Sequence, residues 1–68
     1  MSLTLVTSPP FDPDAADSAA RARLIADWLA ADSRGDRIAA ARIEWEAEQY
    51  DPALADEITA LRNTLAAA

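Results

Sequence analysis

Carboxylates are the most numerous chemically active side chains in this 68-residue chain, which has twelve Asp and Glu residues, six Arg residues, and neither histidine nor cysteine. Without histidine and cysteine, the chain lacks the most common general base, a thiol nucleophile and the usual ligands of a structural zinc site. A carboxylate pair acts as acid and base only where a desolvated pocket separates the two pKa values. A short helical chain has little volume for such a pocket. We therefore expect no enzymatic activity, no cofactor and no bound metal.

Two clusters of acidic residues stand out, and each has a structural explanation beside a functional one. The group that begins at Asp12 lacks the glycine turn and the distal glutamate of a calcium loop, so we interpret it as helix capping. The segment Glu44–Glu48 places three carboxylates within five residues. Its outer pair, Glu44 and Glu48, is mildly repulsive on a helix. Either this segment is a solvated helix face, or a basic partner offsets its charge.

Apolar and aromatic side chains in the segment 36–49 are the strongest candidates for binding another protein. At about 100° per residue, a helix over this segment carries two apolar stripes on roughly opposite sides. The first stripe comprises Ile38, Ala41 and Trp45, and the second comprises Ala39, Ile43, Ala47 and Tyr50. A helix with two apolar stripes contacts two neighbours. Either both neighbours belong to the same chain, or one stripe packs internally and the other contacts a second chain.

Tryptophan and tyrosine are favoured anchors at protein interfaces, where polar and charged residues surround them as a rim. On this basis we predict a partner-binding set, with its two glutamates as the electrostatic rim, that consists of Trp28, Ile43, Glu44, Trp45, Glu48 and Tyr50. The expected partner is another protein chain, either a second copy or a larger and basic protein.

Three helices must position these side chains, and two of them have the same start signal. Asp12-Pro13 and Asp51-Pro52 each join a favourable N-cap residue to a proline, whose missing N–H is not needed in the first turn of a helix. They predict helices near residues 13–32 and 52–66. The later helix carries a narrow apolar seam, which consists of Leu54, Ile58, Leu61 and Leu65. Such a seam packs against one or two neighbouring helices.

The junction between the first and second helices contains Gly35, the only glycine in the chain. Glycine is favoured at the left-handed position that ends many helices, and Asp36 is then the N-cap of a second helix near residues 36–49. In a competing register, Ser33 is the N-cap and Asp36 completes a capping box. The sequence alone leaves both registers open.

These elements predict an all-α fold of three short helices, arranged as an antiparallel bundle or as a helical hairpin plus a third helix, with an extended N-terminal arm. Residues 1–11 form the extended or flexible arm, and residues 12–68 form a single small helical domain. Within the arm, the segment 2–7 has a β-type composition. It is either a terminal tail or a strand that pairs with another chain.

The composition of the whole chain narrows its environment and its partners. A formal net charge of −6 and a pI of about 4.2 disfavour direct contact with nucleic acid. No apolar stretch approaches the ~20 residues that span a bilayer, and no secretory signal is visible, so we expect no membrane contact and a cytoplasmic location. A chain of this size without disulfides buries little surface when alone, so we expect an oligomer.

These features favour a non-enzymatic protein-interaction or regulatory subunit that acts through apolar and aromatic helix surfaces in a homo- or hetero-oligomer. One alternative is an acidic inhibitor that mimics nucleic acid and occupies a basic protein groove. Another alternative is a small phage or assembly component in which the N-terminal arm exchanges between subunits.

Overall fold

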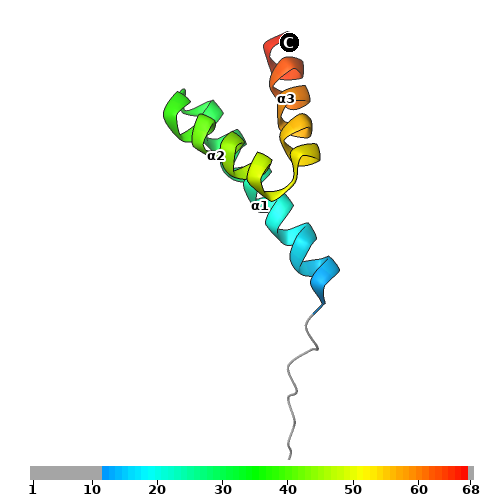
Figure 1. The fold of residues 1–68 in the computed structure, drawn as a ribbon. Coiled ribbons are helices and arrows are strands. Elements are labelled where there is room, and N and C mark those ends of the chain that lie inside the picture. Colours follow the sequence, from blue (N-terminus) through cyan, green and yellow to red (C-terminus); the bar gives the residue numbers. More distant parts are fainter. Residues whose placement is uncertain (1–11, 68) are drawn as a thin grey trace, which may run out of the picture.

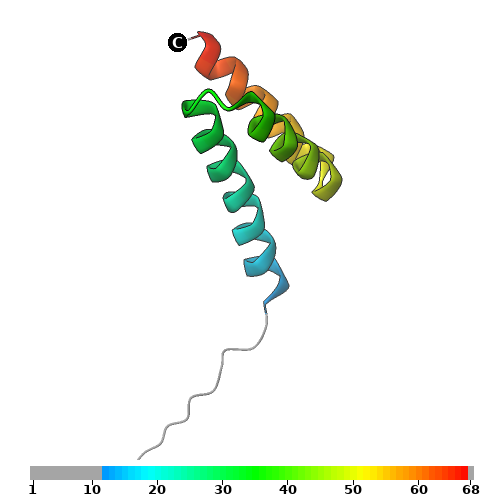
Figure 2. The same ribbon diagram turned by 90° about the vertical axis from the view of Figure 1, so that its left-hand side faces the viewer.

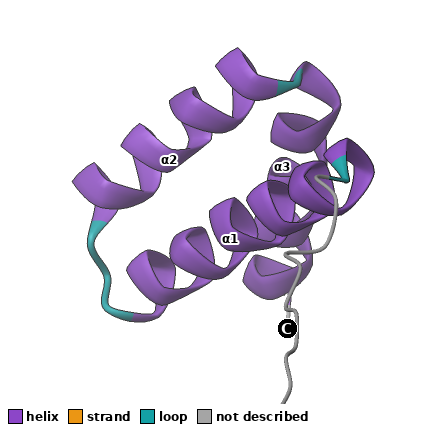
Figure 3. Cartoon of the chain, turned by 90° about the horizontal axis from the view of Figure 1, so that it is seen from below, coloured by secondary structure: helices purple, strands orange, loops and turns teal. Residues whose placement is uncertain are grey.

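Three α-helices make up the regular structure of residues 12–67, the part of the chain that the computed structural model describes (Figure 1). Helix α1 spans Pro13–Ser33, α2 spans Arg37–Tyr50 and α3 spans Pro52–Ala67. Figure 3 shows short loops between these helices and no strand in the described range. The predicted all-α fold of three helices is therefore confirmed. The arm predicted for residues 1–11 lies outside the described residues.

Aspartate side chains start α1 and α3 as the two Asp-Pro signals predict. Asp12 accepts hydrogen bonds from the backbone N–H groups of Asp14 at 3.0 Å and Ala15 at 3.3 Å. Asp51 accepts one from the N–H of Ala53 at 3.0 Å. Each bond satisfies a backbone donor that has no partner inside the first helical turn. Local chemistry thus fixes where both helices begin.

The turn between α1 and α2 is a Schellman motif centred on Gly35, which has a φ of 72°. The N–H of Asp36 donates to the carbonyl of Ala31 at 2.9 Å, and the N–H of Gly35 donates to that of Asp32 at 3.0 Å. The side chain of Asp36 then caps α2 by accepting an amide hydrogen bond from three residues ahead. The register with Ser33 as N-cap is wrong, because Ser33 is still the last residue of α1.

Helix α2 is the central helix and contacts both others, whereas α1 and α3 contact each other over only a short stretch. Figure 1 shows α2 and α3 as the two arms of a V, and Figure 2 shows α1 and α2 diverging from the turn that joins them. Of the two predicted arrangements, this corresponds to the helical hairpin plus a third helix.

The core lies where the three helices meet. Trp28 from α1, Ala47 from α2, and Leu54 and Ile58 from α3 are buried against one another. The partly buried apolar side chains that surround this cluster are Leu24, Ile25, Ala40, Ile43, Ala55 and Leu61. Leu65, the last residue of the predicted α3 seam, is exposed. The core of the described chain is small, and Trp28 is its largest side chain.

Candidate functional site

The two apolar stripes of α2 have different environments. The inner stripe, which consists of Ala39, Ile43, Ala47 and Tyr50, includes the fully buried Ala47. The outer stripe consists of Ile38, Ala41 and Trp45, and all three side chains are exposed. Ile38 is 77% exposed and Trp45 is 63% exposed. At about 100° per residue, Ile38 and Trp45 lie about 160–180° around the helix from Ala47. Ile38 and Trp45 therefore point away from the core of their own chain, while Ala41 lies at the edge of the stripe that borders a cleft beside Trp28.

The outer stripe forms one continuous apolar surface. Ile38 and Trp45 are seven residues apart, which places them about 10 Å from each other along the helix axis. Ala41 lies between them on the same side and adds an apolar, low-profile centre. Single exposed apolar residues are common on proteins, but aligned large ones at helical spacing indicate a contact surface.

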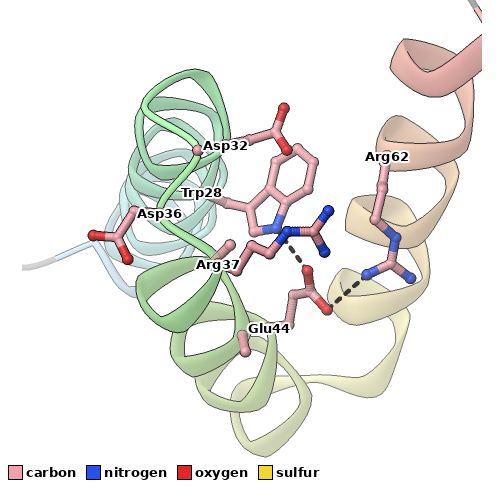
Figure 4. A pocket seen from close by; sticks show the side chains of 9 residues that line it. Trp28, Asp32, Asp36, Arg37, Glu44 and Arg62 are labelled. Carbon is pink, nitrogen blue, oxygen red and sulfur yellow. Dashed lines mark hydrogen bonds and ion pairs between the residues drawn. The ribbon is translucent and has the colours of Figure 1, made fainter.

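Charged and polar side chains border the outer stripe on both flanks. Arg42 and Gln49 lie on one flank, and Arg37 and Glu48 lie on the other; all four are exposed. Within residues 12–67, the ion pairs involve other arginines, so Arg37, Arg42 and Glu48 have no ion-pair partner in this part of their own chain. Arg42 and Glu48 keep their charges available at the surface, whereas the side chain of Arg37 reaches into a cleft beside Glu44 (Figure 4). An apolar centre with a polar and charged rim is also the arrangement that is common at interfaces between proteins.

Glu44 joins all three helices and does not belong to this rim. Its carboxylate accepts a hydrogen bond from Nε1 of Trp28 at 2.8 Å and one from Nη1 of Arg62 at 2.9 Å. Figure 4 shows the carboxylate lying between these two side chains. The repulsion expected between Glu44 and Glu48 is thus offset by an arginine of the same chain, so it requires no basic partner.

The predicted partner-binding residues do not share one surface: Trp28 lies on α1, and the others lie on different sides of α2. Trp28 is only 1% exposed and is a core residue, which leaves its side chain no free surface for a partner. Ile43 packs against the core cluster. Tyr50 is 44% exposed, but its hydroxyl donates to Asp17 of the same chain. Among the predicted residues, Trp45 alone belongs to the outer stripe.

Ile38 is the most exposed large apolar residue of the described chain and is absent from the predicted set. Its position in one stripe with Trp45 is visible in the sequence. Tryptophan and tyrosine were favoured as anchors by residue type, whereas the geometry selects residues by the side of α2 on which they lie. The shared stripe was the signal that could have identified Ile38.

A polar cluster connects the first half of α1 to the junction between α2 and α3. The guanidinium of Arg21 donates from Nε to Asp17 at 2.8 Å and from Nη2 to Asp51 at 2.5 Å. Its central carbon lies 5.5 Å from the centroid of the Tyr50 ring. These residues are up to 33 positions apart in sequence, so the cluster fixes the tertiary position of α1.

Hydrogen bonds set the protonation states in this cluster. The Tyr50 hydroxyl, followed by Arg21, lowers the pKa of Asp17. Arg21, followed by the amide of Ala53, lowers the pKa of Asp51. The Asp17 carboxylate raises the pKa of Tyr50, and the bonds from Asp51 and then Asp17 raise the pKa of Arg21. Every shift moves a pKa further from pH 7, so each of these four groups keeps its usual charge state near pH 7.

Contrary to the expectation that so short a helical chain has little pocket volume, a cleft of about 430 Å³ opens beside Glu44, between the α1–α2 turn and α3 (Figure 4). Its charged lining residues are Asp32, Asp36, Arg37, Glu44 and Arg62. Because Glu44 and Arg62 bond to each other, and Asp36 caps α2, most of this charge is already used inside the chain. Among the described residues, no three possible metal ligands are clustered closely enough to hold an ion.

The comparisons with known proteins add no relative: no family model, no curated protein and no solved structure matches the chain. Within the described residues, none of the helices combines the length and the apolar character that crossing a membrane requires.

Proposed function

We propose that this chain is a non-enzymatic interaction subunit that binds another protein chain through the outer stripe of α2. One observation carries the proposal: Ile38 and Trp45 are exposed together on the side of α2 that faces away from the core. These two side chains are not part of the core cluster, so the fold does not depend on them. Their removal from water would stabilise a complex.

The size of this effect is sufficient for binding. Full burial of one large apolar side chain contributes roughly 1.5–3 kcal/mol. A tryptophan at the centre of an interface is a common hot spot, with a cost of about 2 kcal/mol or more on truncation to alanine. Trp45 and Ile38 together therefore supply the apolar centre of a modest interface, and the charges on both flanks give it specificity.

The acidic-inhibitor alternative depends on the net charge of −6, and five of the twelve acidic side chains already make structural contacts inside the chain. Asp12, Asp36 and Asp51 cap helices, while Asp17 and Glu44 pair with arginines. A nucleic acid mimic needs carboxylates that are free to face a basic groove. These contacts favour a partner-binding site on the apolar outer stripe over one on the acidic surface. The alternative in which the N-terminal arm exchanges between subunits falls on residues outside the described range.

Site-specific photo-crosslinking tests the proposal. A photo-crosslinking amino acid replaces Trp45, or replaces Asp56 as the control, since Asp56 is exposed on α3 and lies outside the stripe. The chain is then irradiated inside the cells that produce it. We expect a covalent adduct with a protein from position 45 and little or none from position 56. The proposal is wrong if position 45 forms no more protein adduct than position 56.

A further inference from the structure

We infer that the protein bound by the outer stripe is a second copy of this chain, whose α2 lies antiparallel to the first across a two-fold axis beside Ala41. This inference rests on the proposed function, because it names the partner of the same face. Three observations carry it: the symmetry of the apolar residues, the position of the flanking charges, and the small side chain at the centre.

The apolar residues of the stripe are complementary to themselves. Ile38 and Trp45 lie at nearly equal distances on either side of Ala41. A two-fold axis at this point therefore places Ile38 of one copy against Trp45 of the other, and the same contact occurs twice. A two-fold interface requires this kind of self-complementarity. The alanine at the axis allows the two helices to approach to the short end of the usual 8–10 Å interaxial range.

The flanking charges agree with the same pairing. A two-fold axis perpendicular to two antiparallel helices brings each flank against the same flank of the other copy. Arg37 and Glu48 share one flank and lie near opposite ends of α2. When its side chain turns out of the cleft that it lines in the single chain, Arg37 of one copy lies opposite Glu48 of the second copy, with an axial offset of about 3 Å. Two symmetric ion pairs result, comparable to those that set partner orientation in coiled coils.

On the other flank, an arginine meets its own copy across the axis, and a glutamate of the same helix offsets this repulsion. Arg42 lies next to the axis and meets its own copy there. Glu46 lies one turn further along each helix on the same flank, within reach of the arginine side chains. In a parallel pairing the two-fold axis would instead run along the helices and bring each flank against the opposite flank of the second copy. Arg37 would then lie near Arg42 of the second copy, and like charges in such contacts repel.

The area of one helix face predicts a weak and reversible dimer. Helix α2 has 14 residues and is about 21 Å long. Its outer face falls at the low end of interface sizes, so we expect a dissociation constant on the order of micromolar. Each copy has a net charge of −6, which opposes association over long range. Moderate salt screens this repulsion, so dimerisation should persist as salt rises, unlike binding to a basic partner.

Charge reversal with sedimentation equilibrium tests the inference on the full chain. Arg37→Glu and Glu48→Arg should each weaken self-association about tenfold, because each turns two attractive pairs into two repulsive ones. An equimolar mixture of the two variants, and the double variant R37E/E48R, should both regain the wild-type dissociation constant. Both substitutions agree with the macrodipole of α2, an acid near its start and a base near its end, so weaker association cannot come from a weaker helix.

Three outcomes overturn the inference. Single variants that associate as tightly as wild type exclude the antiparallel pairing. A mixture or a double variant that stays weak excludes the pairing of residues 37 and 48. A wild-type chain that remains monomeric up to about 1 mM excludes the second copy as partner. In this last case, a photo-adduct between position 45 and a different protein would leave the proposed function intact, whereas no protein adduct at all would remove both.

Discussion

At Glu44, a single carboxylate group holds two other helices, because one oxygen accepts from Trp28 and the other accepts from Arg62. Both donors lose a charged acceptor if this side chain is removed, and Trp28 is then left with an unpaired N–H in the core. The importance of Glu44 is therefore structural, and it depends on residues 16 and 18 positions away in sequence.

Glu44→Ala should lower the free energy of unfolding by about 1–3 kcal/mol, the usual cost of leaving partly buried polar groups without a partner. Glu48→Ala on the same helix is the matched control, because Glu48 is exposed and has no ion pair within the described residues. It should change stability by less than about 0.5 kcal/mol. Urea denaturation at low protein concentration measures both, and equal effects of the two substitutions would contradict the role of Glu44.

The Arg21 cluster predicts how stability depends on pH. The pKa values of Asp17 and Asp51 in the folded chain lie below their ordinary value of 3.8. A lowered carboxyl pKa stabilises the fold above pH 3.8, and this contribution is lost as pH falls through the lowered values. Arg21→Gln removes the main cause of the lowered pKa at Asp51 and the second cause at Asp17, where the Tyr50 hydroxyl remains. The difference in Tm between wild type and R21Q should therefore be largest near pH 6–7 and should shrink below about pH 4.

Arg23→Gln is the control for this pH series, since Arg23 is exposed on the same helix. Its Tm should follow that of wild type at every pH. A difference between wild type and R21Q that stays constant from pH 7 to pH 2 would show that Arg21 acts by packing alone and does not shift the pKa values of its two aspartates.

At the scale of elements, α2 has one side turned to its own chain and one side turned away. Ile43 contacts the core cluster, whereas Ile38 is largely exposed five residues earlier on the same helix. An acidic substitution should therefore destabilise the fold at Ile43 and weaken association at Ile38. This contrast distinguishes a side chain that holds the fold together from one that is available for binding.

Ile43→Asp should destabilise the fold by at least about 2 kcal/mol, because it places a charge against the core. Ile38→Asp should leave helicity and Tm almost unchanged, since an acid in the first turn of α2 is favourable. Circular dichroism measures both effects. Ile38→Asp should instead reduce association in sedimentation experiments. A folded, stable I43D variant would place Ile43 outside the core and would contradict the assignment of the two stripes.

Gly35 is the other element-scale constraint, because its φ of 72° belongs to the left-handed region. A Cβ at this position would meet no atom within 4 Å, so the cost of substitution comes from the backbone alone. Gly35→Val should lower stability by about 1–2 kcal/mol, and Gly35→Asn by less, because Asn tolerates this conformation. Thermal unfolding measures whether stability falls from wild type to Gly35→Asn to Gly35→Val. Equal stability of these three proteins would contradict the prediction.

The extent of each element could be predicted from the sequence because the signals are local. The Asp-Pro dipeptides and Gly35 mark helix ends to within one or two residues of their positions in the structure. The existence of two stripes on α2 was also predictable from spacing. The spacing did not indicate which of the two stripes faces the core, because this depends on how α1 and α3 pack against α2. For the same reason, no local pattern indicated that Glu44 bonds to Trp28 and Arg62.

At the scale of the whole molecule, the proposed association explains two features together: the small core, and the central helix with one uncovered side. Only Trp28, Leu54 and Ile58 are large side chains that are fully buried in the described chain. Such a core gives limited stability, and association adds to it by mass action. The proposed contact through Ile38 and Trp45 therefore links the function of the chain to its stability, so higher protein concentration should raise its Tm.

Fluorine NMR of the chain labelled with 5-fluorotryptophan tests the central claim most directly, because one of its two tryptophans lies in the core and the other lies on the outer stripe. Trp28 is buried in the core and serves as an internal reference, while Trp45 is on the outer stripe. Compared with a dilute sample, the chain inside its producing cells should show a shifted or selectively broadened Trp45 signal and an unchanged Trp28 signal. If the Trp45 signal instead matches the dilute sample and broadens no more than that of Trp28, no other chain covers the outer stripe.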